Sequence, residues 1–149
     1  MREFFEIKGV DDLVKALKRL DFAVEKKLLK DAMRQAGQPV LAAAKQLCPV
    51  DTGRLRESLK LSVSARKGKG VFVYIKIGTG DFKGKTFYGP MVELGHFLGS
   101  RKLGNKRTVI APRPFLRPAF DAHREEAVRI AGEVLKEGVS REFAKGNTH

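Results

Sequence analysis

The hydrophobic period of this chain changes from that of a helix to that of a strand across residues 48–59. From about Val24 to Leu47, apolar residues recur at steps of three and four, as in an amphipathic helix. From Leu59 to Ala65 they alternate with polar residues, as in a half-buried strand. A chain that carries both periods must pack helices on a sheet, so the sequence predicts an α+β fold.

The same reasoning places the neighbouring elements. A short amphipathic helix is predicted over 11–20, and Gly37 and Pro39 predict a kink or a break in the long helix. A second strand over 71–77 should pair with the first as an antiparallel hairpin, because glycines in 66–70 suit a tight turn.

The second half of the chain is predicted to contain shorter elements and one long helix. Residues 88–95 fit a short helix or an edge strand, and 108–110 fit a brief strand. The last helix should begin near Phe115 or Pro118 and end near Phe143. Its inward side chains are expected to be Phe120, Ala127, Ile130, Ala131, Val134 and Leu135. The expected architecture is an antiparallel sheet of three or four strands packed by the long N-terminal helix and the C-terminal helix.

The length of the chain limits it to one ordinary domain. Its 149 residues, 42% of them hydrophobic, suffice for a single core, which we expect over residues 1–144, with 145–149 as an unpacked tail. No apolar run of about 18 residues predicts a membrane span. The acidic start, Met1 to Glu6, does not resemble a signal peptide, and the single Cys48 fits a reducing cytoplasm as a buried apolar residue.

Positive charge is concentrated in the middle of the chain. Residues 61–118 hold 12 Lys/Arg and 2 Asp/Glu, a difference of +10 within a net charge of +13. Such a block attracts phosphate groups or acidic protein surfaces by steering that salt weakens. The charge alone does not show which of these two kinds of partner the chain binds.

Three short segments stand out as motifs. The first, 48–59, contains Pro49, Asp51, Thr52, Gly53 and Leu55; the second, 88–95, contains Tyr88, Glu93 and Gly95; the third, 113–119, contains Arg113, Pro114, Phe115, Arg117 and Pro118. Asp51-Thr52-Gly53 matches the aspartic-protease triplet, but that chemistry needs two carboxylates and the chain has one such triplet. We interpret it as a turn in which Asp51 or Thr52 caps a helix and Gly53 redirects the chain.

The remaining residues that could carry chemistry do not form a site. The glycines of 78–84 lack a phosphate-loop spacing, and His96, His123 and His149 lack metal-ligand spacing. Glu93 is expected to form a structural ion pair with an arginine, because a carboxylate in an apolar stretch is costly to bury unless it is paired. The sequence therefore predicts no catalytic residue, cofactor or metal.

In their order and over this length, the three motifs resemble the "gene ten" tail-component family of long-tailed bacteriophages and prophages. The resemblance extends from Gly9 to about Leu135. It implies a non-enzymatic protein of the virion neck that completes the tail and joins it to the head. It also implies other neck and tail proteins as partners, a homo-oligomeric ring on assembly, a monomer in dilute solution, and assembly in the host cytoplasm.

The basic loops are the expected contact surfaces. The candidate assembly contacts are Arg66, Lys67, Lys69, Lys83, Lys85, Arg101, Lys102, Lys106 and Arg107. The alternative function is a nucleic-acid-binding module, in which these loops would form a basic face. Its stacking residues would be Phe72, Tyr74, Phe82, Phe87, Tyr88 and Phe97. We expect nucleic-acid binding that is at most weak and non-specific.

Overall fold

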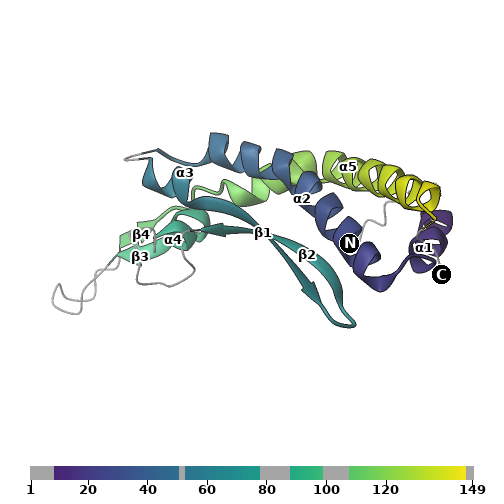
Figure 1. Ribbon diagram of the computed structural model, residues 1–149. Helices are drawn as coiled ribbons and strands as arrows, with labels where there is room; N and C mark the ends of the chain where they lie inside the picture. Colours follow the sequence, from purple (N-terminus) through teal and green to yellow (C-terminus); the bar gives the residue numbers. More distant parts are fainter. Residues whose placement is uncertain (1–8, 51–52, 78–87, 99–107, 147–149) are drawn as a thin grey trace.

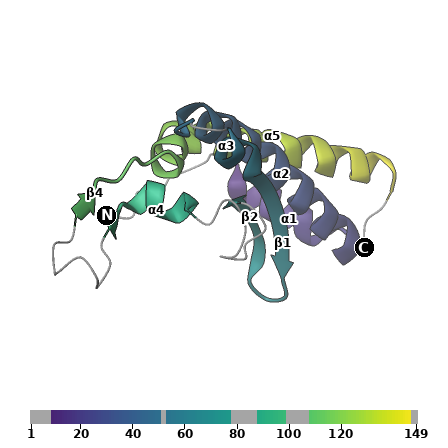
Figure 2. The ribbon, with the colours of Figure 1, turned by 90° about the vertical axis from the view of Figure 1, so that its left-hand side faces the viewer.

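A computed structural model describes residues 9–50, 53–77, 88–98 and 108–146 (Figure 1). In chain order the elements are α1 (Val10–Lys18), α2 (Phe22–Leu47), α3 (Arg54–Ser58), β1 (Leu59–Arg66), β2 (Gly70–Ile77), α4 (Gly89–Leu94), β3 (His96–Leu98), β4 (Thr108–Ile110) and α5 (Leu116–Ala144). The long helices α2 and α5 pack side by side, and the β1–β2 hairpin packs against α2. In both views α4, β3 and β4 lie to one side of this body (Figures 1 and 2).

The four strands form two separate antiparallel pairs. In the hairpin, Leu59 lies opposite Ile77 and Arg66 opposite Gly70. Among the described strands, β3 pairs with β4 and not with the hairpin. The α+β class is confirmed, but the prediction of one sheet with three or four strands is wrong. Helix α4 separates the hairpin from β3 in the chain, which then turns at Gly95, whose φ of 73° suits glycine. After this turn, β3 pairs with β4 and does not extend the hairpin.

Most predicted elements occur near their expected bounds. Residues 88–95 contain a helix rather than a strand, and the brief strand over 108–110 is confirmed. Helix α2 continues through Gly37 and Pro39, so the predicted break does not occur. A proline removes one hydrogen bond from a helix interior, and here the packing of α5 and the hairpin against α2 maintains the helix.

The core lies where the end of α2, α3, the start of β1 and the start of α5 meet. Its buried side chains are Val40, Ala43, Ala44, Cys48, Leu55, Leu59, Phe115 and Ala119. A smaller cluster joins α1 to the far ends of α2 and α5 through Leu17, Leu20 and Val139. Phe120 is not part of either cluster, since its side chain is 55% exposed, and the prediction that it faces the core is wrong. The neighbouring Ala119 takes the buried position on α5, which turns Phe120 outward.

A glycine lets the hairpin lie directly on α2. A Cβ atom added to Gly37 would stand 2.7 Å from a methyl carbon of Leu61 and 3.0 Å from one of Val73. Both distances are shorter than ordinary van der Waals contact. A side chain at Gly37 would therefore push the hairpin away from the helix.

We expect Gly37→Val to lower the free energy of unfolding by about 1–3 kcal/mol, the usual cost of overpacking. The control is Gly132→Ala, because a Cβ atom at Gly132 in α5 has no neighbour within 4 Å. That variant should be more stable by up to about 1 kcal/mol, since alanine favours a helix over glycine. Urea unfolding followed by circular dichroism measures both. Equal stability of Gly37→Val and the wild type would contradict the close packing.

Candidate functional site

The three sequence motifs meet at one junction of the fold. Together they line a cavity of about 190 Å³, to which the chain contributes Pro49, Val50, Gly53, Leu55, Tyr88, Val92 and Arg113. Asp51 and Thr52, and therefore their predicted capping role, lie outside the described residues. Segments that are about 35 and 60 residues from the first motif in the sequence thus come together in space.

The carboxylate of Glu93 caps the N-terminus of α5. The Phe115 and Leu116 N–H groups donate to Oε2 at 2.7 and 3.0 Å, and the Arg117 N–H donates to Oε1 at 3.0 Å. The first N–H groups of a helix have no partner within it, and a negative charge at this end also interacts favourably with the helix dipole. The predicted ion pair between Glu93 and an arginine is not found among the described residues.

Backbone contacts hold α4 in place for this cap. The Arg113 N–H donates to the Val92 carbonyl at 2.8 Å, immediately before α5 begins. A Cβ atom on Gly95 would stand 2.7 Å from the Ile110 carbonyl oxygen, and one on Gly89 would stand 2.6 Å from a methyl carbon of Ile77. Glycine is therefore required on both sides of Glu93 for α4 to approach the hairpin and the chain that leads into α5.

The first motif turns the chain from α2 into the hairpin. Gly53 has a φ of 78°, a conformation that costs little only for glycine, which confirms the predicted redirection at this residue. Leu55 in α3 is buried in the core, and the Ser58 hydroxyl donates to its carbonyl at 2.7 Å. Phe115 of the third motif is fully buried in the same core. The motifs thus hold elements together, which is an architectural role.

Cys48 does not have the surroundings of a nucleophile. Cys48 is 3% exposed, and burial raises the pKa of its thiol, an effect that exceeds the opposing influence of Arg56. A nucleophilic cysteine needs a lowered pKa. The described part of the chain holds no cluster of three His, Cys, Asp or Glu side chains suited to a metal, and none of its helices is long and apolar enough to cross a membrane.

Three of the nine basic residues predicted as assembly contacts are among the described residues. Arg66, Lys67 and Lys69 are exposed at the tip of the β1–β2 hairpin. The other six lie outside the described residues: Lys83, Lys85, Arg101, Lys102, Lys106 and Arg107. The structure therefore places only the first three, and it shows them on one accessible surface.

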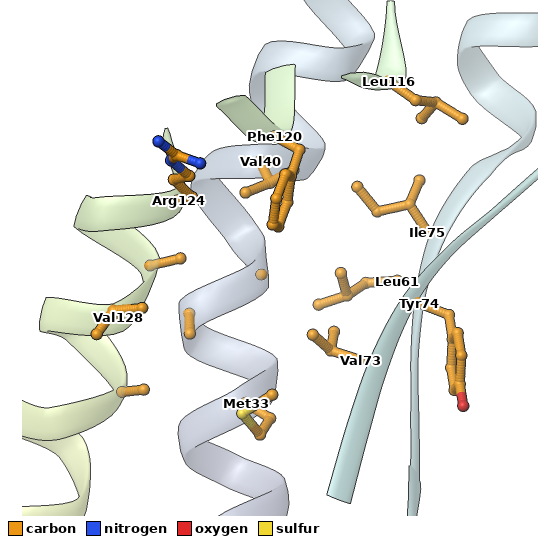
Figure 3. Close-up of a pocket in the computed structure, with 14 residues that line it drawn as sticks. Met33, Val40, Leu61, Val73, Tyr74, Ile75, Leu116, Phe120, Arg124 and Val128 are labelled. Carbon is orange, nitrogen blue, oxygen red and sulfur yellow. The ribbon is translucent and has the colours of Figure 1, made fainter. Parts of the chain in front are cut away.

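An apolar groove between α2, α5 and the hairpin was not predicted from the sequence. It has a volume of about 440 Å³. In Figure 3, Leu61, Val73 and Ile75 point into it from the hairpin, while Phe120 and Val128 border it on α5. The alternation of β1 and β2 does predict which hairpin side chains face this way. It does not reveal that α5 leaves the space partly open.

Comparison with protein families identifies the class of protein that has these motifs. Residues 11–95 match the HK97-gp10-like family, described as a bacteriophage tail component. Because the match covers more than half of the 149 residues, the chain belongs to this phage tail-component family. Comparisons with curated proteins and with solved structures gave no match. The family assignment confirms the resemblance drawn from the motifs, and the matched segment ends before the third motif.

We expect Glu93→Ala to lower the free energy of unfolding by about 1–3 kcal/mol, because three N–H groups lose their acceptor. Glu93→Gln should cost less, since the amide oxygen can still accept hydrogen bonds. Glu133→Ala is the matched control, because Glu133 is an exposed residue of α5 that pairs with Arg129 and should change stability by less than about 0.5 kcal/mol. Urea unfolding compares them. If Glu93→Ala and Glu133→Ala unfold alike, Glu93 is not a structural cap.

The Cys48 thiol should react slowly with an aromatic disulfide reagent in the native protein and rapidly in urea. Burial raises the pKa of the folded Cys48 thiol above the unfolded value of about 9.0. Burial of the neutral thiol therefore makes its full contribution to stability below that pH. This contribution is lost as the pH rises through the folded pKa, since the unfolded thiol ionises first. Urea unfolding from pH 8 to 11 should show a smaller decline in Cys48→Ala than in the wild type. Equal declines would contradict this role of burial.

Proposed function

We propose that this phage tail component completes the tail at its head-proximal end and joins the tail to the head, without catalysing a reaction. Membership of the tail-component family is the observation that carries this proposal. The structural roles of the motif residues support a non-catalytic function. Glu93, Gly53 and Phe115 all hold elements of the fold together. We assign this role to one functional unit over residues 1–144.

A ring of identical subunits requires two different surfaces on each copy that fit each other. Two apolar surfaces support such an arrangement. One is the groove bordered by Phe120 and Val128, and the other is the β3–β4 surface, where the side chains of Phe97 and Val109 are 66% and 68% exposed. The β3–β4 surface lies on the part of the molecule that extends to one side of α2 and α5 (Figure 2).

We propose that the β3–β4 surface of one copy fills the groove of the next copy. Exposed apolar surface is stabilised when a partner removes it from water. Because the two surfaces differ, repetition of the contact closes a ring or continues without limit, and ring closure fits a part that completes a tail. The partners are then other copies of this chain and the neighbouring neck and tail proteins of the virion. Before assembly in the host cytoplasm, the subunit would be a monomer.

Deletion of the gene in a phage that makes particles should leave DNA-filled heads and separate tails that do not join. The reason is that a completion protein acts after both parts have formed, so tube polymerisation should be unaffected. Electron microscopy of the lysate measures this. Joined and infectious particles would contradict the proposal, and a complete absence of heads would assign the protein to an earlier step.

Complementation with two variants separates assembly from folding. Phe120→Ser removes an apolar side chain at the groove and should fail to restore joining. Phe22→Ser removes a side chain that is 71% exposed on α2 and does not line the groove, so it should restore joining. Circular dichroism should show that both variants fold. If both restore joining, the groove is not the contact between copies.

A further inference from the structure

The β1–β2 hairpin has an outer face that points away from the groove and α2. Alternate residues of a strand point to opposite faces. Tyr74 contributes to the lining of the groove, as Leu61 and Val73 do, but Figure 3 shows its ring directed away from the side to which Leu61 and Val73 point. The register pairs the outer residues across the two strands. Lys60 lies opposite Lys76, Ser62 opposite Tyr74, and Ser64 opposite Phe72. These six residues, with Arg66, Lys67 and Lys69 at the tip, are called the outer face below.

The outer face carries positive charge and neutral hydrogen-bond donors, and it carries no acid. Residues 59–77 contain five Lys/Arg and no Asp or Glu. All five cations are exposed, and none forms an ion pair with another described residue. Lysine, arginine, serine and tyrosine are all side chains that donate to phosphate oxygens in complexes with DNA. The nearest acid along the chain, Glu57, directs its carboxylate toward Gly53.

Stacked side chains hold one of these cations in place. The guanidinium of Arg66 lies 5.7 Å from the centre of the Phe72 ring, and Phe72 stacks on Tyr74 with ring centres 6.3 Å apart. Such contacts restrict the arginine to one side of the ribbon while its edge N–H groups can still donate. A held guanidinium donates two parallel hydrogen bonds to a phosphate at a smaller cost in entropy.

The shape of the hairpin fits a nucleic acid. Each strand has eight residues, so the ribbon is roughly 26 Å long, and its tip extends away from both long helices (Figures 1 and 2). A two-stranded ribbon can enter the major groove of B-form DNA. We propose that the outer face binds double-stranded DNA through its phosphates, without reading base sequence.

A DNA backbone suits this face better than an acidic protein surface does. A phosphate backbone presents a regular row of negative charges, whereas protein interfaces combine charges with apolar area. The cations of the outer face lie at both ends of the ribbon, with hydroxyl groups between them. Phe72 is the one apolar side chain on the face, and aliphatic side chains are absent from it. The inference does not depend on the proposed joining function, because it rests on the hairpin alone.

The test measures binding of the full chain to a labelled duplex of about 25 base pairs between about 50 and 200 mM salt. The tip variant is Arg66→Gln/Lys67→Gln/Lys69→Gln. Its control is Lys15→Gln/Lys26→Gln/Lys27→Gln, which removes the same charge from exposed positions of α1 and α2. The tip variant should reduce the slope of log affinity against log salt by about 2–3, because each phosphate contact contributes about 0.9. The control should reduce it by less than about 1.

Three results would overturn the proposal. The first is no binding by the wild type at about 50 mM salt, where phosphate contacts are strongest. The second is an equal loss in the tip variant and the control, which would show that net charge alone attracts DNA. The third is competition by polyglutamate as effective as that by unlabelled duplex, which would assign the face to an acidic protein. Equal affinity for A·T-rich and G·C-rich duplexes is expected, and circular dichroism should show that both variants fold.

Discussion

The hydrogen bonds from the start of α5 to the Glu93 carboxylate are the contact on which the rest of the structure depends. The Phe115 N–H belongs to a residue that is fully buried, so water cannot replace the carboxylate as its acceptor. The same bonds set the position of α5, which then covers one side of α2. They also join α4 to the start of α5, and β3 and β4 lie beside α4 to one side of the body (Figure 1). One carboxylate thus joins the two halves of the chain.

This construction separates the residues that hold the fold from the surfaces that are free for partners. Residues from all three motifs line the junction cavity, and Leu55 and Phe115 are buried in the core. The groove, the β3–β4 surface and the outer face of the hairpin lie outside it. A member of a phage tail-component family with this division is well suited to assembly, because partners can bind its surfaces without disturbing the junction.

The local parts of the fold could be predicted from the sequence, and the contacts between distant parts could not. The apolar period of 24–47 and the alternation of 59–65 depend on neighbouring residues, so α2 and β1 were predicted close to their observed bounds. Gly53 was predicted to redirect the chain because its surroundings have turn chemistry. The motifs were also recognisable as a set. An ion pair was predicted for Glu93, and the described residues show a helix cap instead, because either arrangement satisfies a carboxylate.

The sequence by itself determined the α+β class, the helices, the hairpin and the family, because each follows from short-range periods or from motifs read in order. Only the tertiary structure decided that β3 pairs with β4 instead of extending the hairpin, and that Phe120 faces an open groove instead of the core. The first outcome follows the turn at Gly95, and the second depends on how α5 lies on α2. The start of α5 is fixed by hydrogen bonds between residues 22 to 24 apart in the sequence, and its course by packing on α2, and no local pattern records such long-range contacts.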